Sequence, residues 1–124
     1  MPKTWPVLPT TANKAMEVNV ENVRSQMRKG VLEYCILSIL DKQEAYASSI
    51  IDALKAAGLI VVEGTLYPLL IRLKNQGSLT YRWEESPQGP PRKYYCISED
   101  GRALLGVMDA SWDELVETIK TLKQ

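Results

Sequence analysis

The sequence contains no histidine and no phenylalanine, and it has only two cysteines. Histidine is the most frequent general base and a frequent metal ligand, so its absence removes the commonest catalytic arrangements. Two cysteines are too few for a structural zinc site. No serine or cysteine has a visible activating base, and no glycine-rich phosphate loop is present. These absences predict that the chain is not an enzyme and has no metal ion or cofactor.

Long apolar runs are also missing. The most apolar stretch, residues 31–40, is interrupted by Glu33 and is too short to cross a bilayer. Residues 1–8 lack the apolar segment of a signal peptide. Cys35 and Cys96 form a poor disulfide framework and predict reduced thiols. We therefore expect a cytoplasmic protein that does not contact a membrane.

Net charge is zero, because 15 lysines and arginines balance 15 acidic residues. A neutral total argues weakly against nucleic-acid binding, but the charges are segregated. Cations gather in residues 24–29 and 63–95, whereas acids dominate residues 98–124. For a binding surface this distribution matters more than the sum. A chain of 124 residues is most simply one domain with a modest core, which a dimer interface would help to stabilise.

Residues 63–77 have the pattern of a short helix with two different sides. Its apolar side has helical spacing and consists of Leu66, Leu69, Leu70 and Leu73. Its other side carries small, polar and cationic groups, namely Gly64, Thr65, Pro68, Ile71, Arg72 and Asn75, flanked by Tyr67 and Lys74. Since Pro68 fits only near a helix start, we expect Thr65 to cap the helix and Gly77 to end it. Such a surface suits a DNA groove, although an ordinary amphipathic core helix has the same pattern.

Two helices are expected before this one. The first runs from residues 19–22 to residue 40, and its second half is apolar on nearly every side, which predicts burial. The second covers about residues 46–57, with Ser48 in its first turn, where N–H and hydroxyl groups can hold a phosphate. Residues 1–18 are rich in proline, threonine and asparagine and are predicted to form a flexible arm.

A β-hairpin is expected after Gly77. Three apolar residues alternate with polar ones in a pattern typical of a half-buried strand: Leu79, Tyr81 and Trp83. Residues 85–92 are rich in turn formers, and residues 93–97 return as a second strand. Arg92 and Lys93 at the base of this hairpin are placed to hold phosphate or to enter a minor groove.

The last helix is expected to begin after Ser98, which can cap it. Its apolar residues alternate at spacings of three and four, as in a coiled coil: Leu105, Met108, Trp112, Leu115, Ile119 and Leu122. This seam either packs on the same chain or forms a homodimer interface, which we favour. The indole of Trp112, beside Met108 and Leu115, would then form a slot for a flat aromatic or cationic ligand, unless it simply fills the interface.

Three segments, in this order, resemble the PadR-like transcriptional regulators. Residues 28–40, beginning Arg28-Lys29-Gly30-x-Leu32-Glu33-Tyr34, resemble the family's first helix. The run Gly64-Thr65-Leu66-Tyr67-Pro68-Leu69-Leu70-x-Arg72-Leu73 resembles its recognition helix. Residues 89–101 resemble its wing, second strand and the start of its last helix, and Ser111-Trp112 matches a dipeptide of some multidrug-sensing members. Ala47-Ser48 and Pro90-Pro91 depart from the residues that relatives often carry at these positions.

The expected fold is mainly α with a small β-hairpin: a winged helix-turn-helix over residues 19–97, followed by a C-terminal dimerisation helix over residues 98–124. The resemblance implies a regulator, usually a repressor, that binds double-stranded operator DNA as a homodimer and is released by a small planar effector. The expected DNA contacts are Ser48, Gly64, Thr65, Tyr67, Pro68, Arg72, Lys74, Arg92 and Lys93. The alternative is a winged-helix protein-interaction module without specific DNA binding.

Overall fold

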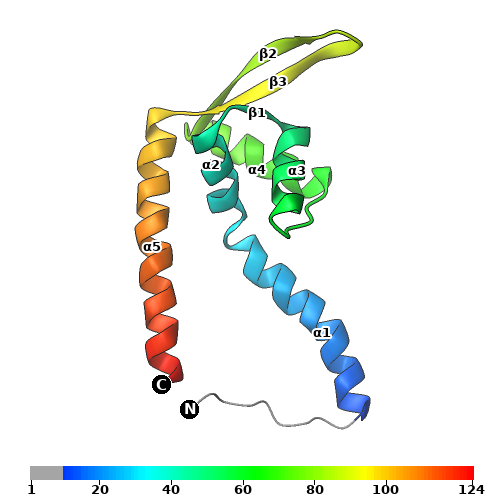
Figure 1. Cartoon of the computed structure of the whole chain (residues 1–124), viewed down its shortest axis with the longest axis vertical. Helices are drawn as coiled ribbons and strands as arrows, with labels where there is room; N and C mark the ends of the chain where they lie inside the picture. Colours follow the sequence, from blue (N-terminus) through cyan, green and yellow to red (C-terminus); the bar gives the residue numbers. More distant parts are fainter. Residues whose placement is uncertain (1–9) are drawn as a thin grey trace.

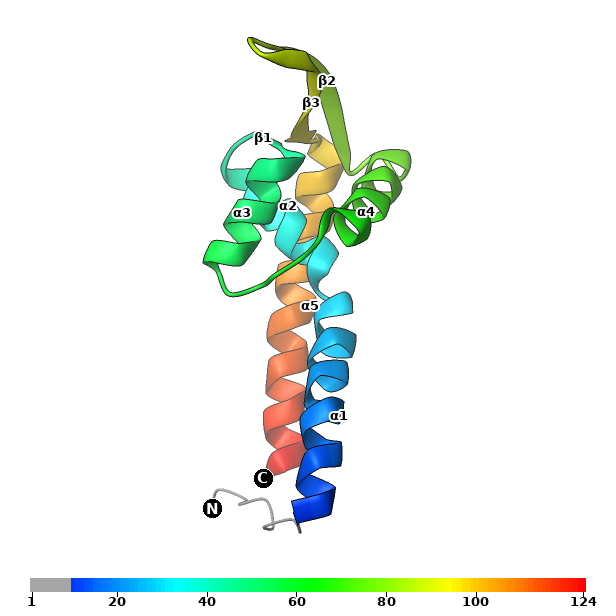
Figure 2. The same ribbon diagram turned by 90° about the vertical axis from the view of Figure 1, so that its right-hand side faces the viewer.

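The computed structural model describes the backbone of residues 10–124 and the side chains of residues 20–124. The elements are α1 (Thr10–Lys29), α2 (Leu32–Lys42), β1 (Ala45–Tyr46), α3 (Ala47–Ala56), α4 (Glu63–Asn75), β2 (Leu79–Ser86), β3 (Gly89–Ile97) and α5 (Glu99–Lys123). Figures 1 and 2 show α2, α3 and α4 clustered below the hairpin, with α1 and α5 extending away on the other side. The expected class, mainly α with a small β-hairpin, is confirmed. No helix within this part of the chain is both long and apolar enough to span a bilayer.

The core of the domain is formed where α2, α3 and α4 meet the base of the sheet. Its fully buried side chains are Ile36, Leu37, Ile50, Leu54, Leu66, Leu70, Leu73 and Leu79. The apolar side of α4 therefore faces inward as its spacing predicts, although Leu69 is only partly buried. Leu105 is also buried in this core, because α5 packs against α2 at this level. Leu105 therefore leaves little exposed surface for the dimer interface in which it was predicted to lie.

The strands form a three-stranded antiparallel sheet in the order β1-β3-β2. The hairpin is longer than the sequence predicts: β2 continues to Ser86 and β3 begins at Gly89. The prolines at 90 and 91 are tolerated because the outer part of β3 pairs only with β2. Arg92 and Lys93 consequently lie opposite Glu84 and Trp83 within the paired strands, and not at the base of the hairpin.

The long first helix expected up to residue 40 is instead two helices. It is broken at Gly30 and Val31, where Val31 leaves helical geometry with φ −119° and ψ −2°. Glycine has a low helix propensity, which explains the break. Helix α1 begins at Thr10, so residues 10–18 are helical where a flexible arm was expected. No proline follows Pro9 in this segment, so nothing interrupts the helix; residues 1–9 lie outside the described part of the chain.

Helix α4 begins without a side-chain cap and is followed by a glycine in left-handed geometry. The helix begins at Glu63 after Val62, and no side chain caps it, so the expected Thr65 cap is wrong. Pro68 accordingly lies inside α4 and not in its first turn, and it cannot donate to the Gly64 carbonyl four residues earlier. Gly77 follows α4 with φ +80°, the left-handed geometry expected for a residue that ends a helix.

Candidate nucleic-acid interface

The front of α4 is exposed. Its solvent-facing residues are Gly64, Thr65, Tyr67, Pro68, Ile71, Arg72 and Lys74. The side chain of Tyr67 is 42% exposed, and that of Arg72 is 65% exposed. The polar side of this helix is thus available to a binding partner, as its sequence predicts.

A hollow of about 400 Å³ lies below the hairpin, at the starts of α3 and α4. Four of the predicted DNA contacts line it, and they come from three different elements: Ser48 from α3, Tyr67 from α4, and Arg92 and Lys93 from β3. Tyr46 and Trp83, which the sequence did not single out, line the same hollow. Residues distant in the sequence therefore form one polar and aromatic surface.

The two cations of this hollow rest on aromatic rings. The Arg92 guanidinium carbon lies 4.0 Å from the Tyr46 ring centroid. The Lys93 ammonium lies 4.5 Å from the Tyr81 centroid and 5.6 Å from that of Trp83. Such cation–π contacts position a cation without neutralising it. Among residues 20–124, neither Arg92 nor Lys93 forms an ion pair, so both charges remain available to an anion.

The remaining predicted contacts lie outside this hollow. Arg72 is paired with Glu33 of α2, its Nε lying 3.3 Å from Glu33 Oε1. Lys74 lies 5.5 Å from the Tyr81 ring on the side of the hairpin. Thr65 lines a smaller hollow beside Arg28 and Lys29 near the end of α1. The structure therefore spreads the predicted contacts along α4, with Tyr67 and Lys74 close to the hairpin.

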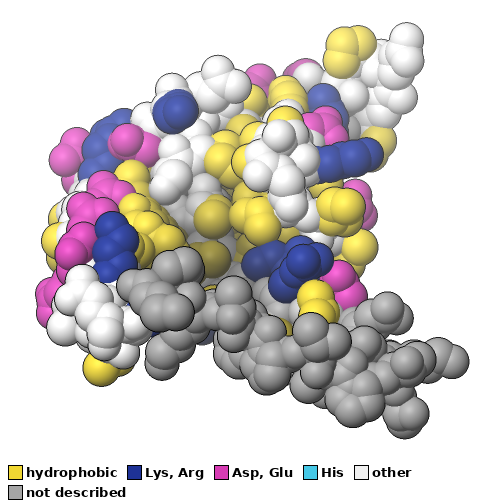
Figure 3. All heavy atoms as spheres, turned by 60° about the horizontal axis from the view of Figure 1, so that its bottom comes forward, with side chains coloured by type: hydrophobic (Ala, Val, Ile, Leu, Met, Phe, Trp, Pro, Cys, Tyr) yellow, Lys and Arg dark blue, Asp and Glu magenta, His cyan; other side chains and the backbone are white. Residues whose placement is uncertain are grey.

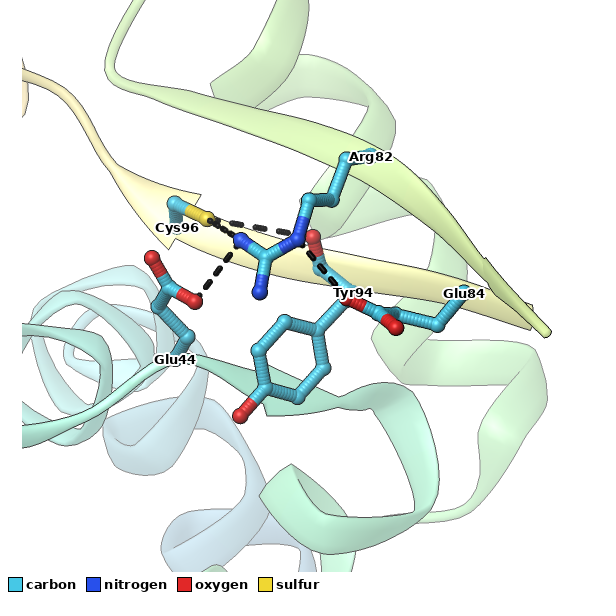
Figure 4. A network of polar contacts seen from close by, with 5 residues as sticks. All are labelled: Glu44, Arg82, Glu84, Tyr94 and Cys96. Carbon is cyan, nitrogen blue, oxygen red and sulfur yellow. Dashed lines mark hydrogen bonds and ion pairs between the residues drawn. The ribbon is translucent and has the colours of Figure 1, made fainter. Parts of the chain in front are cut away.

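The hairpin is attached to the helical domain by Arg82 (Figure 4). Its guanidinium pairs with Glu44 and Glu84, each at 2.8 Å, and lies 4.6 Å from the Tyr94 ring centroid. Arg82 also lies 3.6 Å from the Cys96 sulfur. The hydrogen bond from Arg82 lowers the pKa of Glu44, whereas burial raises the pKa of the Cys96 thiol. No sequence pattern identifies this cluster, because Glu44 lies far from the hairpin along the chain.

A second hollow, of about 430 Å³, lies between α2, α4 and α5. It brings together all three predicted ligand-binding residues, Met108, Trp112 and Leu115. The other lining residues include Glu33, Tyr34, Leu69 and Arg72, so α4 itself forms part of the wall. Figure 3 shows hydrophobic side chains gathered around a recess in the centre of the face seen from the free ends of α1 and α5.

The polar and charged residues that line this second hollow are Lys29, Glu33, Tyr34, Arg72 and Ser111. The Tyr34 hydroxyl donates to Asp109 at 2.5 Å, and this hydrogen bond raises the pKa of Tyr34 to about 12. The Tyr34 ring lies 6.5 Å from that of Trp112. Glu33 Oε1 is buried and accepts no hydrogen bond within the described chain; its contact with Arg72 is an ion pair only. The hollow therefore combines an indole with a carboxylate that is paired with Arg72, and a second cation, Lys29, lines it as well.

The apolar seam of α5 is buried near the start of the helix and exposed further along it. Leu105 is buried and Met108 is partly buried against the chain's own core. Beyond them the seam is exposed, the exposed fractions being 43% for Trp112, 50% for Leu115, 41% for Ile119 and 77% for Leu122. The outer part of the seam is therefore not covered by the described residues of the same chain.

Known proteins share both the sequence pattern and the fold. The family described as "Transcriptional regulator PadR-like family" matches residues 36–107. A PadR-like transcription factor from Bacteroides fragilis is 62% identical, with 82% of this chain and 98% of that chain covered and a TM-score of 0.71. A PadR family regulator from Eggerthella lenta is 31% identical; the match covers 90% of this chain and 97% of that chain, with a TM-score of 0.84. A PadR-like regulator from Bacillus cereus is 37% identical; the match covers 80% of this chain and 97% of that chain, with a TM-score of 0.69.

Proposed function

The chain belongs to the PadR-like family of transcriptional regulators and is accordingly a DNA-binding regulator, and we propose that it binds double-stranded operator DNA as a homodimer and represses transcription. The family consists of regulators and not of enzymes, in keeping with the missing catalytic residues. The observation that carries the proposal is the hollow shared by Ser48, Tyr67, Arg92 and Lys93. A regulator of operator DNA acts where that DNA lies, so we retain the cytoplasm as its expected location.

The contacts follow from the chemistry of each surface. Gly64, Thr65, Tyr67 and Pro68 at the start of α4 allow close approach and offer hydroxyl groups to bases and backbone in a major groove. Arg92 and Lys93 would hold phosphates, as would the first turn of α3 at Ser48. Arg72 and Lys74 would supply further cations along the groove.

The test is binding of duplex DNA by fluorescence anisotropy over a range of salt concentrations. The duplex is selected by the protein from random sequences. Replacing Arg92 and Lys93 by alanine should weaken binding and reduce the slope of log K against log salt by about 2, one for each lost phosphate contact. The matched control replaces Lys120 and Lys123, two cations at the far end of α5, and should leave the slope unchanged. An unchanged slope in the first variant would show that the hairpin does not hold phosphate.

We propose that the second protomer covers the exposed part of the α5 seam. Trp112, Leu115, Ile119 and Leu122 form a continuous apolar row that extends beyond the domain. Large exposed apolar rows mark interaction sites, and a twofold dimer is the commonest assembly. Two recognition helices would then reach successive major grooves, about 34 Å apart.

We further propose that a planar cationic effector binds at Trp112. The indole, Met108 and Leu115 supply the apolar surface, and Glu33 would supply the opposite charge by exchanging its ion pair with Arg72 for one with the ligand. A ligand at this position would change the angle between the two α5 helices and thereby the spacing of the recognition helices.

The effector test uses a variant in which Trp5 and Trp83 are replaced by phenylalanine, so that Trp112 is the sole indole. Proflavine, a flat cation, should quench its fluorescence saturably. Acridone, a neutral molecule of similar shape, should quench it less. An indole that responds to neither compound would instead indicate a purely structural role for Trp112.

One observation favours the alternative function as a protein-interaction module. Ile60, Val62 and Ile71 are 75%, 65% and 56% exposed and lie before and on the recognition helix. Failure to select any duplex from random DNA, together with an intact fold, would favour this alternative over operator binding.

A further inference from the structure

Trp83 is the largest exposed side chain of the hairpin. The strand alternation places Leu79, Tyr81 and Trp83 on the same side of β2, and the sequence therefore predicts that all three lie on the buried face of a half-buried strand. In the structure Leu79 is buried and Tyr81 is half-buried, but Trp83 is 62% exposed. The reason is that the hairpin extends past the helices, as Figure 2 shows, so the core lies under its base only.

The exposed indole is held in position by its neighbours. Its ring lies 6.0 Å from that of Tyr81 at an interplanar angle of 90°. Lys93, the residue opposite Trp83 in the strand pairing, places its ammonium 5.6 Å from the indole. An aromatic group that is already fixed loses little conformational entropy when it binds, so its exposed apolar surface is ready for a partner.

The position of Trp83 indicates what that partner is. The indole lines the same hollow as Ser48 and Tyr67, below the hairpin and beside the start of the recognition helix. The charged side chains that line this hollow are Arg92, Lys93 and Glu63, so cations outnumber acids, and neither cation forms an ion pair within the described chain. A surface that combines a flat apolar ring with free cations is complementary to the sugars and phosphates of a nucleic-acid strand.

The tip of the hairpin carries acidic side chains, in contrast to the cations at the level of Trp83. Glu84 and Glu85 lie beside Trp83, Pro90 and Pro91 in a separate hollow at the tip. Glu84 is paired with Arg82, whereas Glu85 has no ion-pair partner among residues 20–124. A free carboxylate repels phosphate, and no cation lines the hollow at the tip. Two cations outnumber Glu63 in the hollow below, so DNA contact is favoured at the level of Trp83 and Lys93.

We propose that Trp83 is a DNA-contacting residue of the wing. Its indole packs against deoxyribose at the edge of the minor groove, while Lys93 binds the adjacent phosphate. This contact rests on the proposed operator binding and adds to it a residue that provides affinity without charge. Apolar side chains in the minor groove are a known means of adding such contact.

Because the Trp83 indole carries no charge, the salt dependence of DNA binding distinguishes its contact from that of Lys93. Trp83→Ala should weaken binding of the selected duplex roughly tenfold, the scale of one lost aromatic contact, without changing the salt slope. Lys93→Ala should instead reduce the slope by about 1. Trp83→Phe should lie between the wild type and Trp83→Ala, because a smaller ring retains part of the contact.

A second measurement leaves Trp83 in place. In a protein with Trp5→Phe and Trp112→Phe, the remaining indole is Trp83, and addition of the duplex should shift or quench its emission. If the wild type binds DNA while the Trp83 emission and the Trp83→Ala affinity are unchanged, this inference is overturned and operator binding stands. If the wild type binds no duplex, operator binding fails, and the Trp83 contact fails with it.

Discussion

At the residue scale, two glycines of α5 lie in opposite environments. Gly101 is in the first turn, where the helix passes the backbone of Ser78. A Cβ at Gly101 would overlap the Ser78 carbonyl oxygen and lie 2.8 Å from Ile97 Cγ1. A Cβ at Gly106 would meet nothing within 4 Å. Only the first glycine is therefore required by packing.

This difference predicts opposite effects of the same substitution. Gly101→Ala should lower the free energy of unfolding by about 3 kcal/mol, because the overlap involves backbone that cannot move aside. Gly106→Ala should raise it by about 0.5–1 kcal/mol, because alanine favours an exposed helix position. Urea denaturation followed by circular dichroism measures both. Equal effects of the two substitutions would contradict the close approach of α5 to Ser78.

Tyr34 provides a pH-dependent test of the second hollow. Its hydrogen bond to Asp109 raises the pKa of Tyr34 to about 12. Because the folded pKa lies above the ordinary value of about 10, the stabilisation is complete below pH ~10 and is lost as the pH rises toward the folded pKa. In an alkaline titration of tyrosinate absorbance, Asp109→Ala should move one high-pKa tyrosine to lower pH. Tyr34→Phe should remove that tyrosine from the titration, which identifies it.

At the element scale, the orientation of the hairpin depends on few contacts. Strand β1 pairs with β3 through only two residue pairs, Ala45 with Tyr95 and Tyr46 with Tyr94. The Arg82 cluster supplements this pairing by joining β2 to Glu44, which directly precedes β1. Beyond the buried base of the hairpin at Leu79, Tyr95 and Ile97, the wing is held to the helical domain by this short strand, by the Arg82 guanidinium and by the contact of Arg92 with Tyr46.

Removing that guanidinium should loosen the wing. Arg82→Met deletes two exposed ion pairs and a cation–π contact, whose strength is limited because solvent screens the charges. Hydrogen exchange of the β2 and β3 amides should accelerate roughly fivefold, with little change in α2 and α4. Arg102→Met, which removes a comparably exposed cation from α5, is the control. Equal exchange in both variants would mean that β1 alone orients the hairpin.

At the scale of the whole molecule, the proposed dimer depends on the outer half of the α5 seam. Ile119→Glu places a charge in that row and should convert a dimer at micromolar concentration into a monomer, as sedimentation equilibrium would show. DNA affinity should fall with it, because one recognition helix then binds alone. Val107→Glu is the control, since Val107 is 62% exposed and lies off the seam. A wild-type monomer at this concentration would refute the dimer.

Several features of the fold could be predicted from sequence because they depend on local geometry. The leucine spacing correctly identified the buried side of α4. Ser98 caps α5 as expected, its hydroxyl accepting from the Gly101 amide at 3.0 Å. Gly77 ends α4 with positive φ, as a left-handed position requires. These features involve residues a few positions apart, so composition and spacing suffice to predict them.

Other features were decided by tertiary structure alone. The same seam is buried at Leu105 and exposed at Ile119, and the same strand face is buried at Leu79 and exposed at Trp83. The sequence by itself determined which face of each element is apolar. Only the folded chain decided how far that face is covered, because coverage depends on where neighbouring elements end in space.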